Sequence, residues 1–193
     1  DATTYGGSDA GTYDIAYNPL SWSNGNYALV FSSTDGSDGS ITAKVDDVAR
    51  TASLTDHLGT ITKRKVKITG ARGGHDVEKT YDGTTALLDN EYFTGTGEDG
   101  TYYASNLSFD RILDADKTAN RFGVQTVGTY DDANAADSVQ QDQKQHTVSY
   151  RDIRLTNANY ELVEDDGTPW AADGTYEGSG LIKGRVRSVV KGG

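Results

Sequence analysis

The sequence predicts an all-β fold, because short strand-like segments alternate with turn-rich clusters along its 193 residues. Residues 13–17 and 62–68 alternate apolar and polar side chains, which is the period of a half-buried strand. Clusters of Asp, Asn and Gly separate such segments, and these residues satisfy or relax the backbone in tight turns. We therefore expect more than ~40% strand, above the mean for globular proteins. Short helical turns are expected at most near residues 46–58 and 133–143.

The expected strands and turns follow one another along the whole chain. The strands are residues 13–17, 59–70, 145–150, 153–155, 160–163 and 184–190, and the turns are 23–26, 34–39, 98–100 and 164–167. In the second strand Lys63, Lys65 and Lys67 lie on one face, because side chains alternate across a strand. We expect antiparallel strands packed as tandem small β-sandwich (Ig-like) modules. Compact β-grasp-like modules are the alternative.

An internal repeat sets the expected domain organisation. Residues 61–67 (ITKRKVK) align with residues 181–187 (LIKGRVR), and residues 20–29 align more weakly with 155–162. Residues 1–60 then correspond to the closing half of one β module, and residues 61–183 to a complete one. Residues 184–193 are expected to be the opening or donor strand of a following module.

Composition excludes several functions. The chain has no Cys, so thiol catalysis, thiolate metal sites and disulfides are ruled out. Its net charge of −11 disfavours nucleic acid and anionic lipid as partners. No apolar run approaches the ~20 residues that a membrane-spanning helix needs. The absence of Met, position 1 included, leads us to expect a piece of a longer protein.

Residues 79–86 (KTYDGTTA) carry the most informative motif of the chain. A strand-like run lies before it at 59–70, and residues 156–162 (TNANYEL) and 180–187 (GLIKGRVR) follow far downstream. In this order the segments resemble the YDG repeat domain of bacterial surface and secreted adhesins of the filamentous-haemagglutinin type. Residues 1–44 are similar to the end of the MBG modules that accompany it, through 11–13 and 26–27. Residues 70–78, 131–145 and 164–180 depart from the YDG pattern in length or polarity.

The resemblance implies a structural role. The family consists of tandem all-β modules that act as spacers and adhesive stalks and not as enzymes. For this chain it implies an extracellular location, at a bacterial cell surface or in a secreted filament. Neighbouring copies or adjacent modules would be the partners, and surface glycans a further partner. The alternative from a different class is a carbohydrate- or calcium-dependent binding module.

No residue pattern indicates catalysis, and we expect that the chain is not an enzyme. Residues 95–100 (GTGEDG) match the spacing of a dinucleotide-binding loop, but two acids would face the phosphates and no helix pattern follows. A turn between strands explains this segment better. His57, His75 and His146 are not grouped at metal-ligand spacing, and nothing resembles a nucleophile elbow.

Paired carboxylates are the best metal candidates, because Ca²⁺ binds hard oxygen ligands in flexible loops. None of the pairs follows the twelve-residue calcium loop, so we expect most of them to be solvated turn residues. The main candidates are the pairs Asp114/Asp116 and Asp165/Asp166. Two further pairs are Asp35/Asp38 and Asp131/Asp132.

Several aromatic residues are expected to be structural. We expect Tyr81, Tyr27 and Tyr160 to bury their rings, with Asp82 satisfying backbone donors in the turn after Tyr81. Trp22 and Trp170 fit core or interface packing better than exposed platforms for sugars.

The open ends of the repeat predict head-to-tail assembly. An exposed unpaired strand is a liability, so we expect the C-terminal strand of one copy to complete the N-terminal module of the next. Covalent continuation of a tandem chain would give the same contact. The residues expected to make it are Lys183, Arg185, Val186, Arg187, Val189 and Val190.

Overall fold

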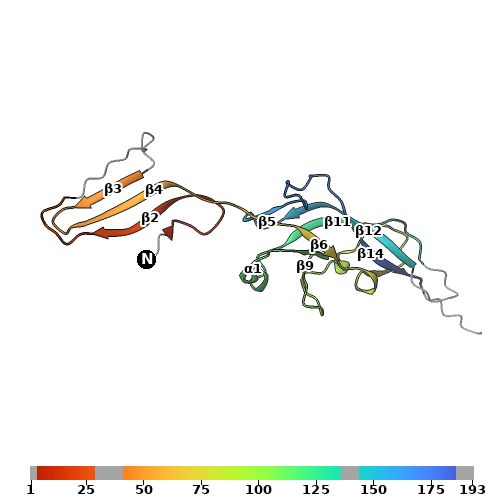
Figure 1. Cartoon of the computed structure of the whole chain (residues 1–193). Helices are drawn as coiled ribbons and strands as arrows, with labels where there is room; N and C mark the ends of the chain where they lie inside the picture. Colours follow the sequence, from red (N-terminus) through yellow and green to blue (C-terminus); the bar gives the residue numbers. More distant parts are fainter. Residues whose placement is uncertain (1–3, 29–40, 136–143, 186–193) are drawn as a thin grey trace, which may run out of the picture. The chain divides into compact units, whose positions relative to one another are not determined.

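The chain folds into two compact units, residues Asp1–Lys63 (unit 1) and Arg64–Gly193 (unit 2) (Figure 1). The structure is a computed structural model that describes residues 4–28, 41–135 and 144–185. Strands make up 48% of it and helices 7%, which confirms the all-β prediction. The division falls after residue 63, three residues beyond the division expected from the repeat.

Unit 1 contains one four-stranded antiparallel sheet of order β1-β2-β4-β3. Its strands are β1 (Thr4–Tyr5), β2 (Gly11–Ser21), β3 (Ile41–Asp46) and β4 (Thr51–Ile61). The helical turns expected within 46–58 are wrong, because this region is the β3–β4 hairpin. Asp46 Oδ1 accepts the Ala49 amide at 2.9 Å and Arg50 takes a φ of 53°, so the chain reverses instead of coiling.

The expected strand over 59–70 is divided among three strands. β4 ends at Ile61 in unit 1, and β5 (Arg64–Val66) and β6 (Ile68–Ala71) follow in unit 2. Val66 is fully buried while Lys65 is exposed, so the alternation is real although the strand is interrupted.

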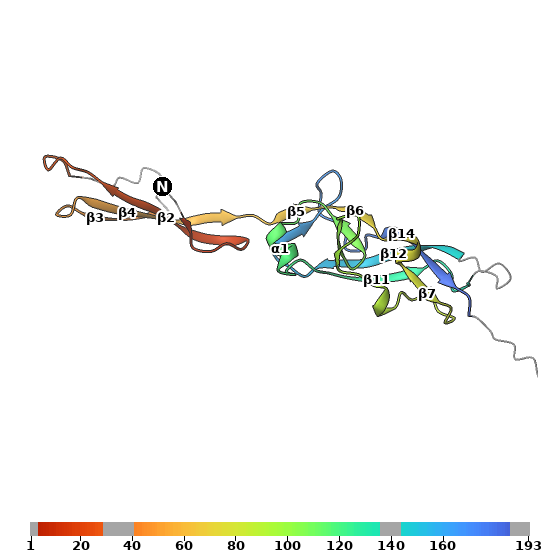
Figure 2. The same cartoon turned by 90° about the horizontal axis from the view of Figure 1, so that it is seen from below.

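Unit 2 contains two four-stranded sheets and a two-stranded one, of orders β6-β10-β9-β8, β11-β12-β14-β7 and β13-β5. The remaining strands are β7 (Glu78–Thr80), β8 (Gly95–Thr96), β9 (Tyr102–Ala104), β10 (Leu107–Phe109), β11 (Val124–Tyr130), β12 (Lys144–Leu155), β13 (Tyr160–Leu162) and β14 (Tyr176–Lys183). One hydrophobic core joins the three sheets, with Val66, Leu107 and Val148 fully buried in it. Figure 2 shows β6 on one side of this unit and β11 and β12 on the other.

Two strand pairs of unit 2 depart from the antiparallel prediction. β5 pairs with β13 and β7 pairs with β14, both in parallel register. Parallel neighbours need long connections, and about ninety residues or more separate each pair along the chain. Alternation within one strand cannot reveal such pairings. The Ig-like topology stays a prediction.

Helices are few and short in the described part of unit 2. They are α1 (Asp114–Thr118) and two 3₁₀ turns, η1 (Gly74–Asp76) and η2 (Asp89–Glu91). The helical turn expected at 133–143 lies mostly outside the described residues, and residues 133–135 are not helical. Within the described ranges, no helix is long and apolar enough to cross a membrane.

The two repeated segments, 61–67 and 181–187, each begin at or near the end of an inner strand. Ile61 ends β4, which lies between β2 and β3 in the sheet of unit 1. Its counterpart Leu181 lies near the end of β14, which lies between β12 and β7. The last described strand of each unit is therefore an inner strand of a four-stranded sheet.

Candidate functional site

The YDG motif closes the sheet β11-β12-β14-β7 upon itself. β7 lies at one edge of this sheet, parallel to β14. The chain then turns through residues 81–84 and pairs with β11, the opposite edge. Leu87 donates its amide to the Gly128 carbonyl at 3.0 Å, and Tyr130 donates to the Thr85 carbonyl at 2.7 Å. The motif is thus a clasp, residues 79–87, that joins the two edges.

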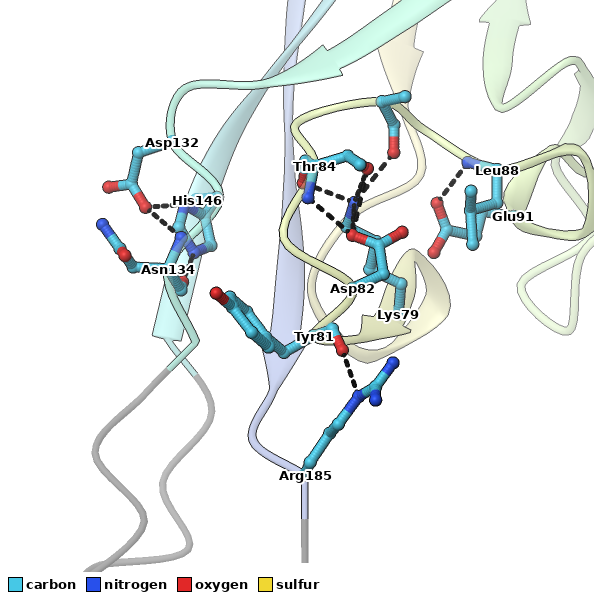
Figure 3. A network of polar contacts seen from close by, with 11 residues as sticks. Lys79, Tyr81, Asp82, Thr84, Leu88, Glu91, Asp132, Asn134, His146 and Arg185 are labelled. Atoms are coloured by element: carbon cyan, nitrogen blue, oxygen red, sulfur yellow. Dashed lines mark hydrogen bonds and ion pairs between the residues drawn. The ribbon is translucent and has the colours of Figure 1, made fainter.

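The Lys79 side chain holds the clasp together from inside (Figure 3). Its ammonium donates to the Thr84 carbonyl at 2.7 Å, the Ala86 carbonyl at 3.0 Å and the Thr84 hydroxyl at 3.2 Å. Asp82 Oδ1 lies 3.1 Å away and completes an ion pair. The side chain is only 1% exposed, and a buried cation is stable only when such partners replace its water. The Tyr130 ring also lies 5.1 Å from the ammonium.

Asp82 shapes the turn of the clasp. Its Oδ1 accepts the Thr84 amide at 2.9 Å and the Thr84 hydroxyl at 3.0 Å. The Thr84 amide and the Lys79 ammonium lower the pKa of Asp82 to about 2. Gly83 takes a φ of +82°, which a residue with a Cβ adopts only with strain. The prediction that Asp82 satisfies backbone donors in this turn is confirmed.

A buried carboxyl group supports the far end of the clasp. Glu91 Oε2 accepts the Leu88 amide at 2.7 Å, while Oε1 is buried and has no hydrogen-bond partner among the described residues. Burial raises the pKa of Glu91 above its ordinary value. Asn106, fully buried, donates to the Glu91 carbonyl at 2.8 Å and to the Tyr150 hydroxyl at 3.2 Å. These two hydrogen bonds connect the segment that follows the clasp to the core of unit 2.

The clasp also holds the end of β14, where the chain leaves the sheet. Tyr81 donates its amide to the Lys183 carbonyl at 2.8 Å, and Arg185 Nε donates to the Tyr81 carbonyl at 2.8 Å. The Lys183 ammonium pairs with Glu78. Two of the expected assembly residues, Lys183 and Arg185, therefore bind within their own unit.

The other assembly residues cannot be placed in the same way. Val186, Arg187, Val189 and Val190 lie outside the described residues, as do all but the first two positions of the expected strand 184–193. Gly184 and Arg185 are not in a strand.

The prediction that Tyr81 buries its ring is wrong, since the residue is 40% exposed. The backbone of Tyr81 and the buried Lys79 do the structural work that we expected of the ring. The prediction for Tyr27 is wrong for the same reason, because that residue is 71% exposed. Tyr160 is buried, which confirms the prediction made for it. The Tyr160 hydroxyl donates to Asp116 at 2.5 Å.

The remaining aromatic and glycine-rich segments behave as structural elements. Trp170 packs against the core of unit 2, and Trp22 is half-buried and donates to the Tyr27 carbonyl at 3.0 Å. Residues 97–100 form the expected turn between β8 and β9, and the Gly97 amide donates to the Thr101 carbonyl across it at 2.8 Å.

His146 lies on β12 near the clasp and forms a cluster that the sequence did not reveal. Its Nδ1 lies 2.6 Å from Asp131 Oδ1, and its Nε2 lies 2.8 Å from the Asn134 carbonyl. A carbonyl only accepts, so Nε2 carries a proton and fixes the ring against the loop after β11. The hydrogen bond from His146 lowers the pKa of Asp131.

The same cluster is a poor metal site. Asp131, Asp132 and His146 each bring one ligand atom within 4.8 Å of the others. Both ring nitrogens are already engaged, however, and a metal would have to displace the loop carbonyl or the carboxylate.

The four main calcium candidates lie in two separate places. Each of these carboxylates already contacts a Lys or Arg side chain or a hydroxyl. On α1, Asp114 pairs with Lys117 at 2.9 Å and Asp116 with Arg121 at 3.2 Å. In the turn after β13, Asp165 pairs with Lys67 at 3.7 Å and Asp166 accepts the Thr168 hydroxyl at 2.7 Å. These four carboxylates do not converge. Asp35 and Asp38 lie outside the described residues.

The three comparisons with known proteins give no match. Neither a family model, nor a curated protein, nor a solved structure matches this chain.

Proposed function

We propose that the chain is a non-enzymatic structural and adhesive module of an extracellular bacterial surface protein or filament, which adds length between its neighbours and carries tension. The observation that carries this proposal is the path of the chain through unit 2. The chain enters at β5 and leaves at the end of β14, and both views place these points at opposite ends of the unit (Figures 1 and 2). Each such unit extends the chain by its own length.

The strand on which tension would act supports the same role. β14 is an inner strand, hydrogen-bonded to β12 on one side and to β7 on the other. Ladder hydrogen bonds lie across the strand direction, so a pull along β14 loads many of them together. The clasp adds the ties of Tyr81 and Arg185 where β14 ends.

The internal repeat supports joining to a neighbour. The last described strand of each unit is an inner strand, and the similar segments 61–67 and 181–187 begin at or near the ends of these two strands. The neighbour follows either by covalent continuation or by addition of the C-terminal strand of one copy to the next. Because Lys183 and Arg185 are used inside unit 2, contact with the neighbour falls to Val186, Arg187, Val189 and Val190.

Force spectroscopy on the full chain, pulled from its two ends, tests the load-bearing role. We expect a distinct force peak for unit 2, and a lower peak in Lys79→Met because the clasp loses its ammonium. Lys117→Met is the matched control, since this lysine makes an exposed pair on α1 away from β14. Unfolding of unit 2 without a measurable peak would contradict the proposal.

A binding module for carbohydrate, with or without calcium, is the second candidate. The observation that favours it is the exposure of two tyrosine rings, Tyr27 and Tyr81, because exposed aromatic rings can stack on sugars. A glycan array and a calorimetric calcium titration separate the two functions. Both stay silent for a pure spacer, and a glycan signal lost in Tyr27→Ala or Tyr81→Ala would support the binding module.

A further inference from the structure

The sheet of unit 1 has one apolar face and one polar face. Paired residues on neighbouring strands point to the same side, so the register assigns each side chain to a face. One face, called the apolar face here, carries Ile15, Tyr17, Leu20, Ala43, Val45 and Leu54. The other carries the Asp14–His57 pair, and Lys44 opposite Ser53.

No described element covers the apolar face. The core that joins the sheets contains residues of unit 2 alone, and the one buried hydrophobic residue in the described part of unit 1 is Ala52, which lies on the apolar face between Leu20 and Val45. Leu20 is 56% exposed and Tyr17 is 39% exposed. A sheet with one apolar face needs a second layer, since stable domains bury such a face against another element. β2, β3 and β4 form a single layer in both views (Figures 1 and 2).

The size of the face indicates what kind of layer fits it. The 11 residues of β2 and of β4, at about 3.3 Å each, give a sheet about 36 Å long, and four strands about 4.8 Å apart make it roughly 15 Å wide. A single extended segment would cover only about a third of that width. A second sheet of the same size would bury roughly 500 Å² on each side, about 1,000 Å² together, which is the area a specific interface needs.

The distribution of charge favours a second copy of this chain as that layer. The chain carries a net charge of −11, which opposes contact between copies over most of its surface. On the apolar face the described residues include one charged side chain, Asp56, while Asp14, Lys44 and Asp46 lie on the other side. This is the surface on which two acidic copies meet with the least repulsion.

We propose that two copies pair through the apolar faces of unit 1, as two sheets stacked face to face about a twofold axis. Stacked sheets pack about 10 Å apart with their strands nearly aligned, and identical faces satisfy the self-complementarity that a twofold contact requires. This lateral pairing is distinct from head-to-tail joining, and either one can fail while the other stands.

Sedimentation equilibrium of the full chain over a range of concentrations tests the pairing. When residues 184–193 are deleted, so that head-to-tail joining cannot add mass, we expect a mass that rises from one chain to two and then stops, because a twofold contact is closed. In the same shortened chain, Leu54→Glu should stay at one chain at every concentration, whereas Ser53→Glu, on the same strand and on the polar face, should still pair.

Leu54→Glu and Ser53→Glu add the same charge to the same strand, so a difference between them reports which face pairs and not the added charge alone. The pairing should also persist after deletion of residues 184–193, which tests head-to-tail joining independently. A single-chain mass at all concentrations, or a two-chain mass that Leu54→Glu leaves unchanged, would overturn the proposal. So would pairing that disappears with residues 184–193.

Discussion

At the scale of single residues, the molecule depends on a lysine that the sequence alone did not single out. Lys79 precedes the Tyr-Asp-Gly motif and looks like an ordinary solvated residue at a strand edge. Its ammonium is buried and binds two backbone carbonyls, a hydroxyl and a carboxylate. Three of these four oxygens, from Asp82 and Thr84, belong to the Tyr-Asp-Gly-Thr-Thr turn.

Replacement of Lys79 by Met should destabilise unit 2 by about 2–4 kcal/mol. Met keeps most of the volume, so the loss comes from the hydrogen bonds that the ammonium donates to the Thr84 and Ala86 carbonyls, since a hydrogen bond to a charged group contributes about 1.5–3 kcal/mol. Urea denaturation measures this difference. Lys117→Met, which removes an exposed pair, should stay within about 0.5 kcal/mol of the native chain. Equal stability of the two variants would contradict the role of Lys79.

Two tyrosines should respond in opposite ways to truncation. Tyr160→Ala should cost about 3–5 kcal/mol, because it empties a buried aromatic site. Tyr81→Ala should cost less than about 1 kcal/mol, since its contacts to Lys183 and Arg185 are made by the backbone. The denaturant midpoints of the two variants give the comparison. A larger loss for Tyr81→Ala would restore the buried role that we first expected of its ring.

At the scale of elements, the clasp turn should make unit 2 sensitive to acid. The pKa of Asp82 falls from 3.8 to about 2 in the fold, chiefly through the Thr84 amide and then through Lys79. A carboxyl with a lowered pKa stabilises the fold fully above its ordinary pKa, and this contribution is lost as the pH falls through the folded value. Unfolding midpoints measured between pH 6 and pH 2 should therefore fall for the native chain.

Asp82→Asn should lose stability at pH 6 and differ less from the native chain near pH 2. Asp99, Asp131 and Asp166, whose pKa values are also lowered, and Glu91, whose pKa is raised, contribute to the pH response of both proteins, so the difference between the two proteins reports Asp82. A constant difference between the two proteins across this range would show that the charge of Asp82 does not support the turn.

The strands themselves could be predicted from the sequence further than their pairings could. Alternation and turn residues locate β2, β12 and β13 and predict the β8–β9 turn, because these signals are local. The parallel pairs β5–β13 and β7–β14 depend on contacts between distant segments. The buried state of Lys79 and the His146–Asp131 contact are also non-local, since their partners are fixed only when β7, β11 and β12 are in place. Tyr27 and Tyr81 were expected to be buried because local pattern does not report which face of a turn is covered.

At the scale of the whole molecule, the two units differ in how completely each buries its apolar residues. The core cluster of unit 2 draws on three sheets and contains fully buried side chains from each of them. The part of unit 1 that the structure describes contains a single sheet, and most of its apolar side chains remain partly exposed. Unit 2 therefore has the layers that an independent domain requires, whereas the described residues of unit 1 supply one layer.

Residues 64–193 should accordingly fold without unit 1. The expected result is an amide NMR spectrum of this fragment that overlays the corresponding signals of the full chain, except near Arg64 where the chain is cut. The reason is that the described members of the core cluster all lie after that residue.

Residues 1–63 should behave differently, because burial of the apolar face requires a second layer. At low concentration we expect narrowly dispersed signals from this fragment, and at high concentration the dispersed signals of a paired sheet. A fully dispersed spectrum of residues 1–63 that does not change with dilution would mean that unit 1 completes its own fold, and a collapsed spectrum of residues 64–193 would mean that unit 2 depends on it.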